Sequence, residues 1–296
     1  MNNSVMELVR LQKSFGPKNV LESVSFSLEP GTVLGLLGAN GSGKTTLIKC
    51  TLGLLRPTGG SVSVFGENSW DLSAAAKARL GYVPQEVTSY PWMRVRQVIA
   101  YTAAFYQNWN QSFVDELSRR WHLPLEDRVG TLSTGQLQTV GIVLALGHEP
   151  ELLVLDEPVA SLDPSARRQF LRTLLEMLDG HERTVLFSTH ITSDLERVAN
   201  RVVILADGQV RFHGELDELK DHVKRLRITA RHDLPASFAV PGALRCEVAG
   251  ANATVSVADF DERLVADMRQ TWDADVSVHD LNLEEIFVEM HDGPVR

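Results

Sequence analysis

The first stretch that could do chemistry is a glycine-rich run over Gly38–Thr45, which reads GANGSGKT and fits the pattern G-x-x-x-x-G-K-[ST]. It follows a short apolar run, Val33–Leu37, and precedes a helical pattern over Thr45–Leu55. Glycines let successive backbone N–H groups curve around a phosphate without a Cβ clash, and the start of a helix favours an anion. We therefore predict a nucleotide-binding loop, with Lys44 on the β- and γ-phosphates and the Thr45 hydroxyl on Mg²⁺.

A pair of adjacent carboxylates, Asp156 and Glu157, ends another apolar run, Leu152–Leu155. Without other motifs, two adjacent acids at this place fit the solvated end of a strand as well as they fit a catalytic site. Beside the glycine-rich loop they indicate hydrolysis, because a buried strand there can deliver a carboxylate to Mg²⁺. We assign that metal-associated role to Asp156. Glu157 points in a different direction and is placed to polarise the attacking water.

Two further polar residues follow predicted strands: Gln85 comes after Leu80–Val83, and His190 comes after Thr184–Ser188. Taken singly, a glutamine at such a place is most often a loop residue, and a lone histidine is most often structural. Their value lies in the set that they form with the loop and the carboxylates. Both are therefore candidate catalytic residues, and Gln85 is also a candidate metal ligand.

The elements that must position these residues alternate between strand and helix. Such alternation predicts parallel strands joined by crossover helices, and hence an α/β fold. The opening strands alternate in hydrophobicity and predict an antiparallel N-terminal sheet. The strands are expected at Val5–Leu11, Leu21–Leu28, Val33–Leu37, Ser61–Phe65, Leu80–Val83, Leu152–Leu155, Thr184–Ser188 and Val202–Leu205, and further helices at Leu72–Arg79, Pro164–Leu178 and Ser193–Ala199.

The chain is expected to divide into a nucleotide-binding domain over 1–215, a charged linker helix over 216–226, and a small α+β domain over 227–296. An all-helical insert at about 91–147 interrupts the first domain. The last domain carries 6 basic and 13 acidic residues, a net charge of −7 out of −9 for the whole chain. Its predicted elements are strands at Arg227–Ala230, Leu244–Val248, Thr254–Val257 and Asp275–His279, and helices at Asp261–Trp272 and Leu283–Met290.

Composition bounds the class of protein. The net charge of −9 argues against a general nucleic-acid binder. No run approaches the ~20 apolar residues that span a bilayer, and the N-terminus lacks a signal-peptide pattern. Cys50 and Cys246 lie far apart, which favours buried, reduced thiols in a cytosolic protein over a disulfide or a metal site.

The stretch Leu132–Gln136, LSTGQ, lies about 20 residues before the strand that carries Asp156, and it resembles the LSGGQ signature of ATP-binding cassette (ABC) ATPases. With it, seven motifs follow in family order over residues 1 to about 215. By this resemblance they are Phe15 as the adenine-stacking aromatic, Gly38–Thr46 as Walker A, Gln85 as the Q-loop, Leu132–Gln136 as the signature, Leu152–Glu157 as Walker B, Ser161–Asp163 as the D-loop, and His190 as the switch histidine.

The resemblance implies a P-loop ABC ATPase core that binds ATP and Mg²⁺ and works as a pair with a second copy or a paralogue. The signature of one subunit would then bind the γ-phosphate held by the other. Thr134 replaces the first signature glycine, and Leu137 stands near a position that is often basic in the family, yet Glu157 and His190 predict a competent enzyme. The implied nucleotide-binding residues are Phe15, Gly38, Asn40, Gly41, Ser42, Gly43, Lys44, Thr45, Thr46, Ser133, Gly135, Gln136 and Asp163.

Between Gln85 and Leu132 the insert is too short for a long coiled coil, and only one cassette is present, which disfavours DNA-repair and translation relatives. In transporters of this family the insert receives a separate membrane subunit. The segments 105–110 and 281–289 look like those of bacterial drug and antimicrobial-peptide exporters. Six aromatic residues are candidates for that contact, although aromatics at helical spacing more often belong to the core: Tyr90, Trp92, Tyr101, Phe105, Tyr106 and Trp109.

These features predict an ATPase subunit at the inner face of the plasma membrane that drives a separate transmembrane permease, most simply an exporter, and that has no nucleic-acid partner. The alternative from another class is a non-transport ABC ATPase that acts as a mechanical signalling or assembly module. Its ATP chemistry would be the same, and only its partner would differ.

Overall fold

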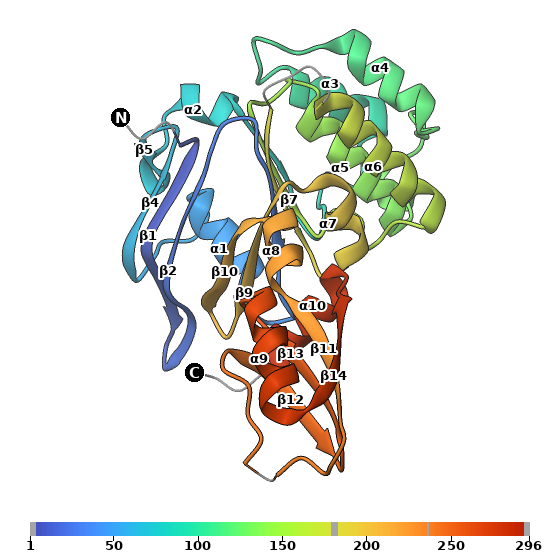
Figure 1. Cartoon of the computed structure of the whole chain (residues 1–296). Coiled ribbons are helices and arrows are strands. Elements are labelled where there is room, and N and C mark those ends of the chain that lie inside the picture. The colour runs from blue at the N-terminus through green and yellow to red at the C-terminus, as the bar shows by residue number, and fades with distance from the viewer. Residues whose placement is uncertain (1–3, 179–182, 236, 293–296) are drawn as a thin grey trace. The chain divides into compact units, whose positions relative to one another are not determined.

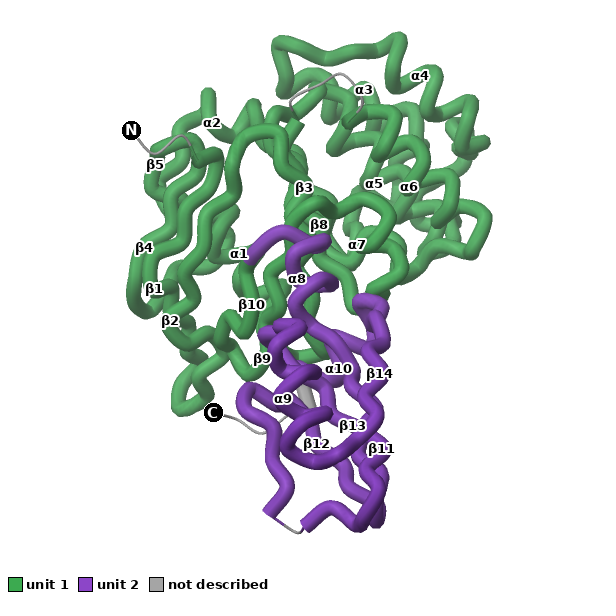
Figure 2. Tube along the Cα trace, in the orientation of Figure 1, with its two compact units in different colours: residues 1–213 green, residues 214–296 purple. Residues whose placement is uncertain are grey.

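The computed structural model describes residues 4–178, 183–235 and 237–292. The chain forms two compact units, residues 1–213 and residues 214–296 (Figure 2).

Two sheets organise the first unit (Figure 1). The smaller is antiparallel in the order β2-β1-β4-β5, with β1 at Met6–Phe15, β2 at Lys18–Leu28, β4 at Gly59–Val64 and β5 at Glu67–Asn68. Its strands bury alternate side chains, as an antiparallel sheet with one covered face requires. The predicted N-terminal antiparallel sheet is confirmed.

The larger sheet has the order β10-β9-β3-β8-β7-β6. From β9 to β6 every neighbouring pair is parallel, which confirms the predicted α/β core. All residues of β3, β7 and β8 are buried, as expected for central strands of a parallel sheet. The strands are β3 at Val33–Leu37, β6 at Leu80–Val83, β7 at Leu152–Asp156, β8 at Thr184–Thr189, β9 at Arg201–Ala206 and β10 at Gln209–Glu215, of which only β10 was not predicted.

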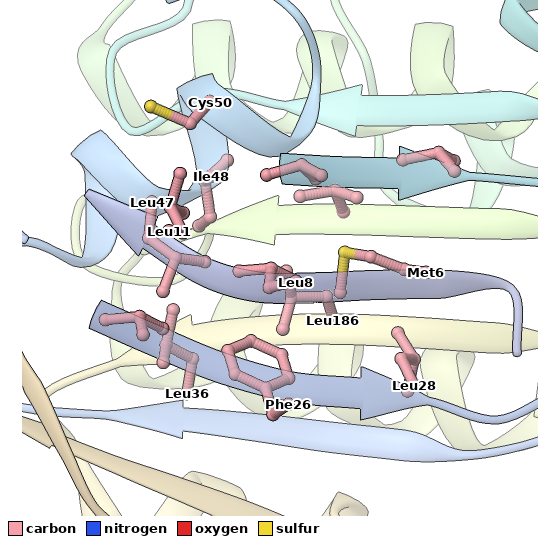
Figure 3. Close-up of a cluster of buried hydrophobic side chains, with 14 of the residues drawn as sticks. Met6, Leu8, Leu11, Phe26, Leu28, Leu36, Leu47, Ile48, Cys50 and Leu186 are labelled. Atoms are coloured by element: carbon pink, nitrogen blue, oxygen red, sulfur yellow. The ribbon is translucent and has the colours of Figure 1, made fainter. Parts of the chain in front are cut away.

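The two sheets share one hydrophobic core (Figure 3). Leu8 and Phe26 of the antiparallel sheet, Leu36 and Leu186 of the parallel sheet, and Leu47 of helix α1 all belong to it. Helix α1 spans Lys44–Thr51 and contacts strands of both sheets. This packing fixes the start of α1, and with it the glycine-rich loop, against the end of β3.

Helix α1 ends at Thr51, four residues before the predicted Leu55. Gly53 adopts φ +67°, its N–H donates to the Cys50 carbonyl, and the Leu54 N–H donates to the Lys49 carbonyl. This pair of bonds closes a helix C-terminus around a left-handed glycine. The prediction placed the stop at the Pro57–Gly60 turn and overlooked this earlier glycine.

Helices dominate the segment between β6 and β7, as predicted. They are α3 at Val95–Ala103, α4 at Gln111–Arg120 and α5 at Thr134–Leu146, together with a short 3₁₀ turn at Val129–Thr131. The six aromatic candidates separate into two groups. Tyr90, Trp92, Tyr101 and Phe105 are exposed and touch one another in a chain, with ring centroids 5.1–5.5 Å apart. Tyr106 instead stacks on the buried His148 at 4.0 Å and adjoins Trp109.

Three helices flank the remaining crossovers of the first unit: α2 at Ala74–Ala78, α6 at Pro164–Leu178 and α7 at Thr192–Val198, with a 3₁₀ turn at Ser69–Asp71. Asp163 caps α6, because its Oδ1 accepts hydrogen bonds from the Ser165 and Ala166 N–H groups at 2.8 and 3.1 Å. These bonds hold the pKa of Asp163 below its usual value.

The second unit is a four-stranded antiparallel sheet in the order β12-β13-β11-β14, with helices α8, α9 and α10. Leu226, Ile228, Val255 and Val276 centre its own apolar core. The elements are α8 at Leu216–His222, β11 at Lys224–Ala230, β12 at Ala243–Ala249, β13 at Asn252–Val257, α9 at Glu262–Trp272, β14 at Ala274–Asp280 and α10 at Leu283–Asp292.

Two predictions for this region need correction. The linker helix ends at His222 and not at 226, because Leu226 lies in β11, where every second residue is buried. The expected burial of both cysteines holds for Cys50 only, since Cys246 lies exposed on edge strand β12.

Candidate active site

The carboxyl ends of the parallel strands bring the predicted site residues together at one edge of the sheet. Leu37 of β3 pairs with Thr189 of β8, and Ser188 pairs with Asp156 of β7. The glycine-rich loop follows β3, Glu157 follows β7 and His190 follows β8. In open α/β sheets, ligands bind at this edge.

The glycine-rich loop has the backbone that only glycine adopts readily. Gly41 and Gly43 have φ values of +84° and +106°, where side chains are strained. At Gly38, a Cβ atom would lie 2.4 Å from the Ser42 hydroxyl and 2.6 Å from the Leu205 carbonyl. The loop therefore curls tightly, and the N–H groups of the first turn of α1 lack intrahelical acceptors.

An open hollow of about 440 Å³ lies over this loop. Gln85 from the segment after β6 and Glu157 from the segment after β7 reach it, so residues far apart in sequence share one cavity. Its wall is formed by Lys18, Val20, Asn40, Gly41, Gly43, Lys44, Thr45, Thr46, Gln85 and Glu157.

Lys44 is buried and brings a positive charge to the floor of the site. Its Nζ donates to the Gly38 carbonyl at 2.8 Å and lies 3.3 Å from the Glu157 Oε1. The ammonium thus donates a hydrogen bond to the loop and forms an ion pair with the carboxylate. The group is thereby fixed beside the position where the loop would hold a phosphate.

Asp156 is fully buried and has one satisfied and one unsatisfied oxygen. Its Oδ1 accepts from the Ser188 hydroxyl at 2.8 Å and from the Thr45 hydroxyl at 3.2 Å, whereas Oδ2 has no hydrogen-bond partner among the described residues. Desolvation raises the pKa of Asp156, and the two hydroxyl bonds oppose that shift. A buried carboxylate oxygen without a partner costs free energy unless a cation or donor meets it.

These oxygens fit Mg²⁺. A hydroxyl and a carboxylate are the hard ligands that Mg²⁺ prefers, and the ion commonly takes one or two protein ligands together with substrate phosphates. Within the described ranges no cluster of three or more His, Cys, Asp or Glu side chains could hold a metal alone, so further ligands would come from the substrate and water.

Glu157 occupies a constrained position between the lysine and the histidine. It has φ +49°, and its N–H donates to the Ser188 carbonyl and hydroxyl, both at 3.1 Å. Its Oε2 lies 2.8 Å from the His190 Nδ1 and also accepts from the His190 N–H at 3.4 Å. Strained backbone held in place by several bonds is typical of functional positions.

Ser188 is a site residue that the sequence analysis did not identify. Its hydroxyl donates to the Asp156 carboxylate while it accepts from the Glu157 backbone N–H, so one atom orients the first carboxylate and holds the backbone that carries the second. Lys18 and Val20 of β2 also line the hollow and were not predicted. The sequence does carry one signal for Ser188, since it directly precedes Thr189 and His190 at a strand end.

Several expected ligands lie outside this cavity. Ser133, Gly135 and Gln136 are not among the described residues that line it. Phe15 is half exposed, and the Lys13 ammonium lies 4.9 Å from its ring centroid. The structure thus unites Walker A, Gln85, Asp156, Glu157 and His190, and leaves the signature as a separate surface.

Comparison with known proteins identifies the family. The model of the ABC transporter family matches residues 21–160. YxlF of Bacillus subtilis, an uncharacterised ABC transporter ATP-binding protein, is 33% identical over 221 residues, which are 73% of this chain and 72% of that protein. This chain belongs to the ABC transporter ATP-binding proteins. It is therefore an ABC ATPase, as its motifs predicted.

Other relatives cover the ABC ATPase more completely or carry a more specific name. The Nod factor export ATP-binding protein I of Bradyrhizobium diazoefficiens is 30% identical and aligns with 98% of this chain and 97% of its own length. The bacitracin transport ATP-binding protein BcrA of Bacillus licheniformis is 30% identical, with coverages of 74% and 72%. A solved ATP-binding subunit of an ABC transporter matches 74% of this chain and 92% of its own, with 30% identity and a TM-score of 0.68.

The signature of this ABC ATPase starts helix α5. The Ser133 hydroxyl accepts from the Gln136 N–H at 3.2 Å, and the Gln136 side chain accepts from the Ser133 N–H at 2.9 Å. Gly135 sits in the first turn, where a Cβ atom would lie 3.0 Å from the Ser161 carbonyl of the D-loop. The departure at Thr134 leaves this reciprocal cap intact. None of the helices in the described part of the chain has the length and apolar character to cross a bilayer.

Proposed function

We propose that this ABC ATPase hydrolyses ATP with Glu157 as the general base and acts as one of two paired subunits of an exporter. The observation that carries the proposal is the arrangement of Glu157, which is buried between the Lys44 ammonium and the His190 imidazole at the wall of the hollow. A carboxylate fixed in this way can take a proton from water while the lysine holds the phosphate that the water attacks.

Each polar residue has a distinct role in this proposal. Loop N–H groups and Lys44 bind the β- and γ-phosphates, while Thr45 and Asp156 hold Mg²⁺, with Gln85 beside them. When bound, Mg²⁺ would neutralise charge on the phosphates. The proton of the attacking water passes to the Glu157 carboxylate, which His190 orients through the 2.8 Å contact. The products are ADP and phosphate.

The signature supplies the reason for pairing. A serine hydroxyl accepts and donates at once, so Ser133 can cap its helix through Gln136 and still donate to a phosphate. The Gly135 N–H lies in the first turn of a 13-residue helix and has no intrahelical acceptor. Neither residue is among the described residues that line their own chain's hollow, so in this proposal a second subunit would complete each site, with Phe15 stacking on adenine and Asp163 holding the D-loop at the interface.

Export through a separate membrane subunit is supported by the names of the relatives. One relative exports Nod factor and another transports bacitracin. A chain of this kind would lie at the inner face of the plasma membrane beside its permease.

Crosslinking in native cells tests this partner. A polytopic membrane protein should co-purify with the chain. Co-purification of ribosomal or DNA-associated proteins in its place would contradict a role in transport.

Substitution of Glu157 by Gln tests the hydrolytic role, because the amide keeps the shape and cannot accept the water's proton. We expect ATP turnover to fall at least 100-fold while ATP binding persists and traps a dimer. Glu176→Gln is the matched control, since Glu176 is a surface residue paired with Arg120 and should leave turnover unchanged. Turnover near the normal rate in Glu157→Gln would remove Glu157 from its role.

A further inference from the structure

The second unit contains an exposed edge strand, β12, that none of the nucleotide chemistry uses. β12 spans Ala243–Ala249 and pairs with β13 along one side only, since the sheet order is β12-β13-β11-β14. All residues from Arg245 to Ala249 are exposed. An edge strand presents unpaired N–H and C=O groups, and proteins usually cover or blunt such an edge.

The side chains of β12 form a self-complementary sequence around Cys246. If two copies of the strand meet antiparallel with Cys246 opposite Cys246, every residue faces the one at an equal distance on the other side. Arg245 then faces Glu247 of the other copy, and Glu247 faces Arg245. Opposite charges directly across a strand pair are favourable, whereas like charges would repel.

The two charged residues already meet within one chain. Arg245 and Glu247 lie two apart, on the same face of the strand, and the Arg245 Nη2 is 2.6 Å from the Glu247 Oε1. In the paired arrangement, each of these two side chains could also contact its opposite charge on the other strand without a change of backbone. On the other face lie Cys246 and Val248, whose β13 partners Val255 and Ala253 belong to the core. Val248 is 44% exposed, so this apolar face continues uncovered to the sheet edge.

We propose that β12 is a self-association surface, on which a second copy of this chain pairs antiparallel with Cys246 at the two-fold axis. The four-stranded sheet of the second unit would become a continuous eight-stranded sheet across two copies. The proposal depends on charge complementarity, on the exposed edge and on the uncovered apolar face. It goes beyond ATP-dependent pairing, because it needs neither the signature nor the glycine-rich loop.

Cysteine crosslinking reports on this register. Facing residues of an antiparallel pair have Cα atoms about 4.5–5.5 Å apart, which a disulfide can span. The chain's other cysteine, Cys50, is buried, so Cys246 is the thiol that an oxidant reaches. In the full-length protein without nucleotide, copper phenanthroline should take two electrons and two protons from a pair of Cys246 thiols and give a reducible covalent dimer.

Three variants separate specific pairing from random collision. Val248→Cys combined with Cys246→Ser places the thiols four residues out of register, about 13 Å apart along the strands, and should crosslink at least tenfold more slowly. In Arg245→Glu, the new glutamate of each copy faces Glu247 of the other copy, so two like-charged pairs form across the strands. The dimer should then dissociate about tenfold more readily, as measured by sedimentation. Arg245→Glu with Glu247→Arg restores the opposite charges and should restore association.

The Cys246→Ser protein should still associate, because the thiol only reports on the pairing. Equal crosslinking of both cysteine positions, or association that ignores the charge reversal, would overturn the proposal. A protein that stays monomeric without nucleotide at tens of micromolar would overturn it as well. The dimer that ATP traps in the Glu157→Gln variant forms at the catalytic site. The β12 variants should leave that dimer unaffected.

Discussion

Removal of the Ser188 hydroxyl should be costly, because this one atom bonds to the Asp156 carboxylate and to the backbone N–H of Glu157. Ser188 is fully buried and makes hydrogen bonds of 2.8 Å to Asp156 and 3.1 Å from the Glu157 N–H. A bond to a charged group contributes about 1.5–3 kcal/mol. We therefore expect Ser188→Ala to lower the free energy of unfolding by about 2–3 kcal/mol at neutral pH.

The cost should depend on pH with a definite sign. Desolvation raises the pKa of Asp156 and the Ser188 bond opposes it, so Ser188→Ala raises the folded-state pKa further. A carboxyl whose folded pKa lies above its unfolded value destabilises the folded state as pH rises through that window. The difference between wild type and variant should be greatest at neutral pH and should shrink as the pH falls toward the raised pKa.

Urea unfolding in a Trp272→Phe background measures this difference, because the remaining tryptophans all lie in the first unit. Ser118→Ala is the matched control: its hydroxyl is buried without a hydrogen-bond partner in the described residues, so its loss should cost under about 0.5 kcal/mol. ATP turnover of Ser188→Ala should fall roughly 10- to 100-fold. Equal stability of the two variants, or full turnover in Ser188→Ala, would refute this reasoning.

Three other perturbations have expected outcomes. Gly53→Ala should lower the free energy of unfolding by about 2–4 kcal/mol in urea titration, because φ is +67° and the new Cβ would lie 2.0 Å from the Ser69 carbonyl. Arg225→Met should cost the second unit about 2–4 kcal/mol, followed by Trp272 fluorescence, since the buried Glu289 loses the partner 2.9 Å away. His190→Ala should reduce ATP turnover about 100-fold in a phosphate-release assay while nucleotide affinity changes little.

The first two of these have a matched control. Gly66 also has a positive φ, of +79°, but open space around it, so Gly66→Ala should cost only about 1 kcal/mol. Arg225→Met with Glu289→Met removes the uncompensated charge and should regain most of the loss. Equal costs at Gly53 and Gly66, no recovery in the Arg225 double variant, or normal turnover in His190→Ala would contradict the respective argument.

The sequence predicted which residues meet, because strand ends in a parallel α/β sheet converge at one edge. Gln85, Asp156, Glu157 and His190 each follow an apolar strand, and the structure gathers them at that edge. The sequence could not show that the Ser188 hydroxyl bonds to the Asp156 carboxylate and to the Glu157 backbone N–H, since its place before Thr189 and His190 at a strand end does not reveal its hydrogen-bond partners. It also could not show which donors lie outside the cavity. Ser133 stands at the start of a helix, where a serine can either cap the helix or bind a ligand.

The predicted ends of helices were wrong where a local signal competed with a longer pattern. The apolar helical pattern continued past Thr51, but Gly53 ended α1 first. Charged residues at 216–226 fitted a helix, yet the alternation that begins at Lys224 places Leu226 in the sheet core. Strand β10 was missed because most of its side chains are only partly buried and do not alternate.

A mixture of two defective proteins tests most directly whether the site is completed by a second subunit. Lys44→Ala removes phosphate binding in its own chain, and Ser133→Asp keeps the helix cap while it repels a γ-phosphate. Each should be inactive alone. If they pair at random, half of the dimers are mixed and one of their two sites is intact, so about a quarter of normal turnover should return. Turnover that stays at the sum of the two separate proteins would contradict a shared site.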